Sequence, residues 1–169
     1  MKIISWNVNG IRAVHKKGLL EDFINKHKPD ILCLQEIKAK KEDFGIDFKD
    51  YQEFWNPAER AGYSGTAIFT KTKPESITLG FPTDISTKYD LQNDTYGDLN
   101  KEGRVITAEF DSPAGEFYLV NVYTPNSKGD LSRLPLRHKK WYPAFLEYAD
   151  NLKKTENVIF CGDLNVAHK

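Results

Sequence analysis

The stretch Asn157-Val158-Ile159-Phe160-Cys161-Gly162-Asp163-Leu164-Asn165 joins an apolar run to polar residues that follow it directly. The four apolar residues 158–161, two of them β-branched, predict a strand that is buried on both faces. Gly162 ends the run, so Asp163 and Asn165 fall at the carboxyl end of this strand. Open α/β sheets gather their chemistry at that edge, which makes Asp163 and Asn165 candidate site residues.

The same four letters, Gly-Asp-Leu-Asn, occur earlier at residues 97–100. No apolar strand precedes this copy, and it lies in the polar run 88–102, which is typical of a loop. We therefore interpret the earlier copy as a solvated turn and the later copy as a candidate site.

The composition is that of one globular domain without a membrane-spanning segment. A chain of 169 residues is long enough for one ordinary domain. No apolar run approaches the roughly 20 residues of a membrane span, and the N-terminus has too short an apolar core for a signal peptide. Cys33 and Cys161 each lie in a strand-like apolar run, which favours buried thiols in a reducing compartment. We expect a soluble, cytoplasmic protein.

The formal net charge is zero, because 24 Lys and Arg balance 24 Asp and Glu. This balance argues mildly against a protein that coats nucleic acid through bulk electrostatics. It leaves room for an enzyme with a local basic rim and an acidic metal site.

The N-terminal third predicts a strand, a helix and a second strand. Residues 2–8 form the first strand, and apolar residues at helical spacing predict a short helix over 19–27 that Pro29 stops. Residues 30–36 form the second strand. A right-handed crossover through the helix makes the two strands parallel.

The rest of the chain predicts a mixed sheet and a longer helix. We expect strands at 51–55 and 65–71, a charged loop with a helical turn over 38–49, and little regular structure over 72–100. Strands at 104–111 and 116–124 flank a hairpin turn. A helix then begins at the N-cap Ser132. Its apolar face consists of Leu134, Trp141, Phe145, Tyr148 and Leu152. The fold class is α/β with a mixed sheet, since hairpins and crossovers both occur.

Polar side chains stand at the ends of four predicted strands. Each alone has an ordinary explanation as a turn former, a surface carboxylate or an aromatic at the core edge. Together they predict an oxygen-rich pocket suited to Mg²⁺ or Mn²⁺, with a phenol and amides as donors to phosphate oxygens. No Gly-rich phosphate loop or Ser-His-Asp arrangement occurs, so the chemistry implied is metal-assisted hydrolysis of a phosphate ester. The residues are Asn7, Asn9, Glu36, Tyr123, Asn126, Asp163 and Asn165.

Several motifs in order carry a resemblance to a known family. They are Ser5-Trp6-Asn7-Val8-Asn9-Gly10-Ile11-Arg12, Leu34-Gln35-Glu36, Gly62-Tyr63-Ser64-Gly65, Glu102-Gly103-Arg104, Asn121-Val122-Tyr123-Thr124-Pro125-Asn126 and Gly162-Asp163-Leu164-Asn165. The sequence resembles, from end to end, the exodeoxyribonuclease III family of apurinic/apyrimidinic (AP) endonucleases, within the endonuclease/exonuclease/phosphatase superfamily. The Trp-Asn-x-Asn-Gly and Tyr-x-Pro-Asn motifs favour this branch over the wider superfamily.

The resemblance implies magnesium-dependent hydrolysis of DNA phosphodiester bonds at abasic sites and 3′ ends, as in base-excision repair. It implies that Glu36 ligates the metal with Asn7 nearby, and that Asp163 orients and deprotonates the attacking water. Asn9 stands where some members carry Asp.

Other roles are implied for residues that contact the substrate. Tyr123 and Asn126 would contact the scissile phosphate, and Asn165 would hold Asp163 or a phosphate oxygen. Asn7 would also lie against the substrate. Contacts to the DNA backbone, or alternatively plain solvated surface charges, are expected of Arg12, Lys38 and Arg133.

The family fold is a four-layer α/β sandwich with two sheets packed face to face and helices outside. Such domains run to roughly 200–250 residues, and the family pattern continues with a further Asp and a terminal Ser-Asp-His. We expect residues 1–169 to be the N-terminal part of one incomplete domain, lacking the C-terminal half and building about one sheet. His168 belongs to the Gly-Asp-Leu-Asn stretch and is not assigned a catalytic role.

Two expectations follow from this incompleteness. Cleavage by the chain alone should be impaired. Its uncovered sheet face should promote self-association, or pairing with the missing half. The alternatives are another phosphodiesterase or phosphatase of the superfamily, acting on lipid or nucleotide substrates, and a non-catalytic binding module.

Overall fold

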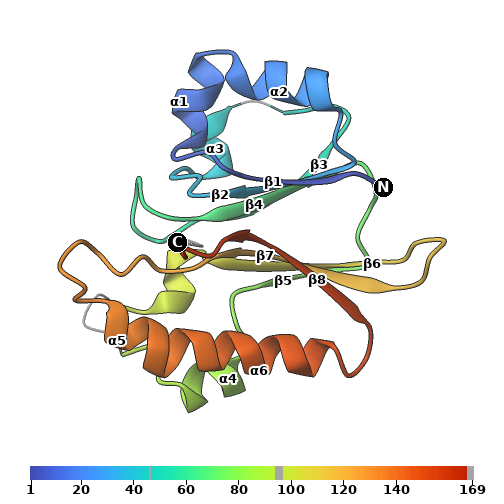
Figure 1. Ribbon diagram of the computed structural model, residues 1–169. Helices are drawn as coiled ribbons and strands as arrows, with labels where there is room; N and C mark the ends of the chain where they lie inside the picture. The colour runs from blue at the N-terminus through green and yellow to red at the C-terminus, as the bar shows by residue number, and fades with distance from the viewer. Residues whose placement is uncertain (46, 94–96, 167–169) are drawn as a thin grey trace.

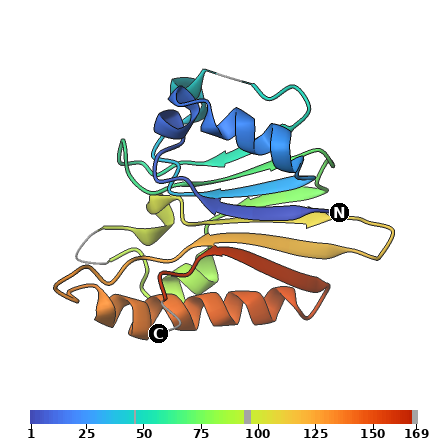
Figure 2. The same ribbon diagram turned by 45° about the horizontal axis from the view of Figure 1, so that its top comes forward.

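Two four-stranded sheets pack face to face, with helices on the outer face of each (Figures 1 and 2). The computed structural model describes residues 1–45, 47–93 and 97–166. These layers confirm the predicted four-layer α/β sandwich. The expectation that the chain builds about one sheet is wrong, since the structure contains two. The apolar pattern of a strand shows that the strand is buried but not to which sheet it belongs.

The first sheet has the strand order β1-β2-β4-β3. Its strands are β1 (Ile3–Asn7), β2 (Ile31–Gln35), β4 (Thr66–Thr70) and β3 (Gln52–Asn56). β1 and β2 are parallel as predicted, and β4 runs antiparallel to both of its neighbours.

Three helices belong to the half of the chain that builds the first sheet. They are α1 (Ile11–Lys16), α2 (Leu19–His27) and α3 (Lys41–Phe44). α2 was predicted from its apolar spacing, and it buries Leu20 and Ile24, four residues apart. α1 was not predicted, since its six residues bury only Ile11 and show no full apolar face.

The second sheet has the order β5-β6-β7-β8. Its strands are β5 (Ser76–Leu79), β6 (Val105–Phe110), β7 (Phe117–Tyr123) and β8 (Asn157–Asp163). β6 and β7 form the predicted hairpin, and β7 and β8 are parallel. The region 72–100 is more regular than expected, because it contains β5, the helix α4 (Thr83–Lys88) and the start of the 3-10 helix η1 (Leu99–Glu102).

A long helical segment connects β7 to β8. It comprises α5 (Leu134–Leu136), the π-helical turn η2 (Arg137–Trp141) and α6 (Tyr142–Leu152). Trp141 and Tyr148 are buried, as the predicted apolar face requires. The N-cap position is Arg133 and not Ser132, because the chain enters the helix one residue later than expected.

The space between the sheets is filled by apolar side chains from both. Ile31, Cys33 and Ile68 of the first sheet form one buried cluster with Ile106 and Leu119 of the second. Cys33 is buried as predicted, whereas Cys161 is only partly so, and both are free thiols. The inner faces therefore cover each other, contrary to the expected bare face.

A polar contact crosses this apolar interface. The Gln35 side chain donates from Nε2 to Asn121 Oδ1 at 2.7 Å. Asn121 Nδ2 in turn donates to the carbonyl oxygens of Leu34 and Ala67 at 3.0 and 2.9 Å. Because these groups are buried, their pairing fixes how the two sheets align.

β8 lies at the edge of the second sheet, and its residues are exposed or half-buried. The prediction that this strand is buried on both faces is therefore wrong. β8 pairs with β7 alone within the described residues, and Ile159 and Phe160 are 43% and 51% exposed. Gly162 approaches β7 closely: its φ is +144°, and a Cβ there would lie 1.8 Å from the Val122 carbonyl oxygen. Only glycine fits this point, immediately before Asp163.

The earlier Gly-Asp-Leu-Asn copy forms a turn, as predicted, and this turn is only partly solvated. Asp98 accepts a hydrogen bond from the Asn100 main-chain N–H at 2.9 Å, while Leu99 is buried. Of the helices in the described ranges, none is both long and apolar enough to cross a membrane.

Candidate active site

Four strands end at the same edge of the sandwich. Asn7 of β1 is in register with Gln35 of β2, directly before Glu36. Tyr123 of β7 is in register with Asp163 of β8. Because each of these pairs is parallel, their carboxyl ends carry the polar residues to one place.

The Asn7 side chain links the two sheets at this edge. Its amide Nδ2 donates to Asp163 Oδ2 at 2.7 Å and to Glu36 Oε2 at 3.1 Å. Its Oδ1 accepts from the Asn9 main-chain N–H at 2.9 Å, which fixes the direction of the amide. Two carboxylates from different sheets are thereby held within reach of one amide.

Glu36 also has a cationic partner. Lys38 Nζ lies 3.0 Å from Glu36 Oε1 and donates to the Asn9 side-chain oxygen. Both charged side chains remain partly exposed. The Glu36 carboxylate is therefore oriented by Asn7 on one oxygen and by Lys38 on the other.

Asp163 is oriented by Asn165 through the main chain. The Asn165 N–H donates to Asp163 Oδ1 at 2.8 Å. The Asn165 side chain turns away and donates from Nδ2 to the Thr124 carbonyl at 2.7 Å. With Asn7 on Oδ2, both Asp163 carboxylate oxygens accept hydrogen bonds.

Tyr123 is buried beside these carboxylates. Burial, and then the negative charge of Glu36, raise the pKa of Tyr123 to about 12. The Arg104 guanidinium lies 4.7 Å from the centre of the Tyr123 ring and opposes this shift. Its Nη1 also donates to the Tyr123 carbonyl at 3.1 Å. The phenol is thus neutral at physiological pH and can donate a hydrogen bond.

Several residues at the site have a strained backbone. Left-handed φ values, rare for residues other than glycine, occur at Asn9, Glu36, Lys38 and Asn165, between +45° and +56°. Main-chain hydrogen bonds continue beyond the strand ends next to Asn9, Glu36 and Lys38. The Gly10 N–H donates to Glu36 O, and the Lys38 N–H donates to Ser64 O. Strain of this kind persists where the surrounding structure enforces it, and it clusters at functional sites.

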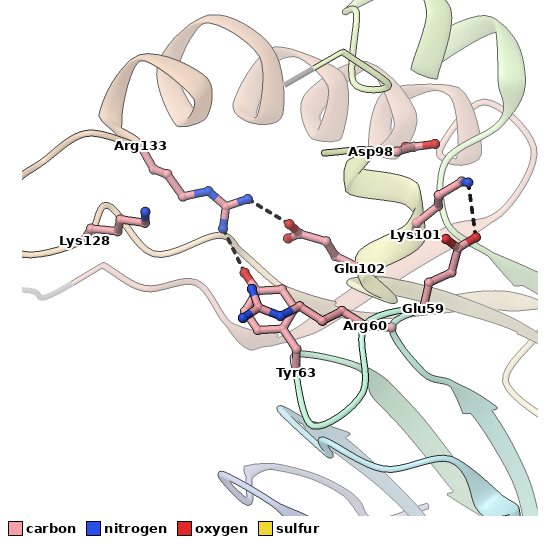
Figure 3. A pocket seen from close by; sticks show the side chains of 9 residues that line it. Glu59, Arg60, Tyr63, Asp98, Lys101, Glu102, Lys128 and Arg133 are labelled. Atoms are coloured by element: carbon pink, nitrogen blue, oxygen red, sulfur yellow. Dashed lines mark hydrogen bonds and ion pairs between the residues drawn. The ribbon is translucent and has the colours of Figure 1, made fainter. Parts of the chain in front are cut away.

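A second polar network lines a cavity of about 330 Å³ next to the site (Figure 3). Arg133 donates to Glu102 Oε1 at 2.9 Å and to the Tyr63 hydroxyl at 3.0 Å. Glu102 Oε2 accepts from Arg104 Nε at 2.5 Å. Lys128 and Arg60 also line the cavity.

Arg133 is not the solvated surface charge that was one alternative, since it is only 2% exposed. It lies at the start of the helix α5, and its side chain points toward Glu102 and Tyr63 (Figure 3). A direct phosphate contact by Arg133 stays a prediction.

Arg12 and Asn126 lie outside this hydrogen-bonded cluster. Both are exposed, and within the described ranges neither forms a hydrogen bond to Asn7, Glu36 or Asp163. Arg12 and Lys38 line a smaller cavity of about 140 Å³, together with Arg60. His168 lies outside the described residues.

A known protein family matches nearly the whole chain. The model of the Endonuclease/Exonuclease/phosphatase family matches residues 4–169. The chain belongs to the endonuclease/exonuclease/phosphatase family.

Individual members of the endonuclease/exonuclease/phosphatase family are similar over nearly the whole chain. An exodeoxyribonuclease of Bacillus subtilis is 40% identical over 169 residues, covering all of this chain and 60% of that protein. A DNA-(apurinic or apyrimidinic site) endonuclease of Dictyostelium discoideum is 42% identical, covering 99% of this chain and 42% of that protein. The crystal structure of an AP endonuclease from Leishmania major superimposes with a TM-score of 0.77 at 32% identity, over 98% of this chain and 55% of that one. The chain thus spans about half the length of these relatives.

The endonuclease/exonuclease/phosphatase site fits a divalent ion by its donors. No group of three or more His, Cys, Asp or Glu side chains gathers within the described part of the chain. Mg²⁺ does not need one, because it binds through one or two carboxylates and completes its shell with water and phosphate. The Glu36 and Asp163 carboxylates, both within reach of the Asn7 amide, supply donors of this kind.

Two residues of this family site were not assigned roles from the sequence. Arg104 and Tyr63 belong to motifs that carried the resemblance, yet a single Arg or Tyr in a short motif gives no sign of its partner. The contact of Tyr63 with Arg133 depends on loops from the two sheets meeting. Arg104, directly before β6, reaches Tyr123 of the neighbouring strand in the same sheet.

Proposed function

We propose that this chain carries the active site of a magnesium-dependent nuclease that hydrolyses DNA phosphodiester bonds at abasic sites and 3′ ends, a reaction of base-excision repair. The observation that supports it most is the Asn7 amide between Glu36 and Asp163. Relatives that are about 40% identical are named as an exodeoxyribonuclease and as AP endonucleases. The proposed partner is therefore duplex DNA.

In this proposal Glu36 holds the metal, and Asn7 lies beside it at the metal site with its amide nitrogen on the Glu36 carboxylate. Mg²⁺, or Mn²⁺, would supply charge neutralisation at the phosphate oxygens when bound. Lys38 would hold Glu36 in place from the opposite side.

Asp163 is the proposed base for the attacking water. Asn7 and the Asn165 N–H fix its two oxygens, and a fixed carboxylate within hydrogen-bond reach of a water can accept its proton. Tyr123, whose phenol keeps its proton at physiological pH, would donate to an oxygen of the scissile phosphate. Asn126, exposed three residues further along, would donate to the same group.

Backbone phosphates would contact the exposed basic rim. Arg12 and Lys38 line one cavity there. Such contacts position DNA without reading its sequence.

The test is cleavage of an end-labelled duplex with one abasic site, in the presence of Mg²⁺, by the purified chain and by Glu36→Ala. The exodeoxyribonuclease of Bacillus subtilis, a longer relative, is assayed in parallel as the reference for the cleavage rate. We expect weak, Glu36-dependent cleavage of the abasic duplex, much slower than that of the longer enzyme. Cleavage as fast as that enzyme would show that the chain is not impaired.

Two further measurements separate the alternatives. Hydrolysis of nucleotide or lipid phosphates in place of DNA would favour another phosphodiesterase or phosphatase of the superfamily. Thermal unfolding with increasing Mg²⁺ tests metal binding, and we expect the Tm to rise for the wild type but not for Glu36→Ala. Absence of both a Mg²⁺ response and cleavage would favour a non-catalytic binding module.

A further inference from the structure

Arg137 is a buried cation that none of the proposed roles uses. It is the first residue of the π-helical turn η2, and it is 6% exposed. The chain after β8 lies against the beginning of this long helix (Figure 2). Arg137 therefore stands between the helix and the segment that carries Asp163.

The guanidinium joins the two loops that carry the proposed catalytic residues. Nη1 donates to Ser127 Oγ at 2.6 Å, one residue after Asn126. Nη2 donates to the carbonyl oxygens of Asn165 and Leu164 at 3.1 and 3.4 Å, directly after Asp163. One planar group thus binds the loop after β7 and the loop after β8.

The π-helical turn brings a second contact to the same guanidinium. In this turn the Tyr142 N–H donates to the Arg137 carbonyl, five residues back, where an α-helix would bond four residues back. The Tyr142 hydroxyl accepts from Arg137 Nη2, and the guanidinium lies 5.2 Å from the centre of the Tyr142 ring. Isolated π turns are frequent at functional sites, and this one fixes the direction of Arg137.

Apart from Arg137, the segment after β8 is anchored by the Asn165 side chain, which donates to the Thr124 carbonyl. Leu164 is exposed, and Asn165 has a strained left-handed backbone. Asp163 depends on this segment, since one of its carboxylate oxygens is held by the Asn165 N–H. A shift of the Asn165 main chain would therefore move the carboxylate relative to Asn7.

We propose that Arg137 is a positioning residue, which holds the Asp163–Asn165 segment and the Asn126–Ser127 loop in their catalytic arrangement. This rests on the proposed function for its effect on catalysis, but the positioning itself is a property of the folded chain. A misplacement of about 1 Å at a catalytic group can cost about 100-fold in rate.

The test compares Arg137→Met, which keeps the apolar stem, with Arg137→Lys, which keeps the charge but loses the planar fork. Amide hydrogen exchange is measured on the chain without DNA. In Arg137→Met we expect at least 10-fold faster exchange confined to 163–166 and 124–128. Arg137→Lys should restore this protection only in part, because one ammonium group cannot reach both loops. Lys139→Met is the control, since Lys139 is exposed on the same π turn.

Cleavage of abasic duplex gives the second readout. We expect Arg137→Met to lower kcat by about 100-fold at an unchanged KM. Ser127→Ala, which removes one acceptor and leaves the helix intact, should lower kcat several-fold. Lys139→Met should do neither.

The outcomes keep the two proposals separate. If the wild type cleaves no abasic DNA, the proposed function fails for the isolated chain, and hydrogen exchange still decides the role of Arg137. Unchanged exchange at 163–166 in Arg137→Met would overturn the positioning role. Faster exchange spread over the whole chain, or full recovery in Arg137→Lys, would overturn it equally.

Discussion

Tyr123 shows how single residues at the site acquire their chemistry from their surroundings. Its ordinary pKa of about 10 rises to about 12, first through burial and then through the charge of Glu36. In the folded chain the phenol thus keeps its proton to higher pH than in the unfolded chain. The corresponding stability is present below about pH 10 and is lost as the pH rises toward 12.

We predict that Glu36→Gln lowers the pKa of Tyr123, because one of the charges that raise it is removed. The measurement is the pH titration of the Tyr123 ring carbon that bears the hydroxyl, by nuclear magnetic resonance with labelled tyrosine. Glu59→Gln, at an exposed residue paired with Lys101, is the control and should change nothing. A wild-type midpoint near pH 10 would contradict the prediction.

At the scale of strands and sheets, the contact between Gln35 and Asn121 holds the two halves of the site in register. Asn121 lies two residues before Tyr123, and Gln35 lies one residue before Glu36. The direct hydrogen bonds from Asn121 to the carbonyl oxygens of Leu34 and Ala67 tie β7 to β2 and β4. The alignment of the sheets at this point decides whether Asn7 can reach both carboxylates.

We predict that Asn121→Leu lowers the free energy of unfolding by about 2 kcal/mol, because the Gln35 amide and the Leu34 carbonyl lose a buried partner. Urea denaturation measures this change. The control Asn157→Leu, at an exposed residue of β8, should stay within about 0.5 kcal/mol of the wild type. Equal losses in the two variants would contradict a special role for Asn121.

At the scale of the whole molecule, β8 forms one edge of the second sheet. Within the described residues no strand pairs with its outer side, and its apolar side chains Ile159 and Phe160 are partly exposed. Phe160 packs against Phe145 of α6 with ring centres 5.6 Å apart, whereas Ile159 lines a groove with Met1 and Ile3. Edges of this kind pair with another chain unless charge or a covering segment prevents it.

We predict that the purified chain self-associates through β8. Ile159→Lys should shift the molecular mass measured by light scattering toward the monomer, since a charge on an edge strand opposes pairing. Leu146→Lys, which alters an exposed apolar residue on α6, is the control and should leave association unchanged. A monodisperse wild-type monomer would contradict the prediction.

Local patterns were sufficient for most strands and for the polar residues at their ends. Asn7, Glu36, Tyr123 and Asp163 were found because each follows or ends an apolar run, and parallel pairing brings such ends together. Short elements such as α1 and β5 were missed, because six or four residues carry too little periodicity to be distinguished from a loop.

The sequence by itself determined the α/β class, the parallel pair β1–β2 and the chemical types of the site residues, because the spacing of apolar residues shows where strands lie and where they end. Tertiary structure alone decided that the chain contains two sheets, that β8 is an edge and that Arg133 turns inward to Glu102. It alone decided the bond between Asn7 and Asp163, which are 156 residues apart. The physical reason is that the spacing of apolar residues along the chain shows which side chains are buried. Which element buries them depends on the packing of the whole chain.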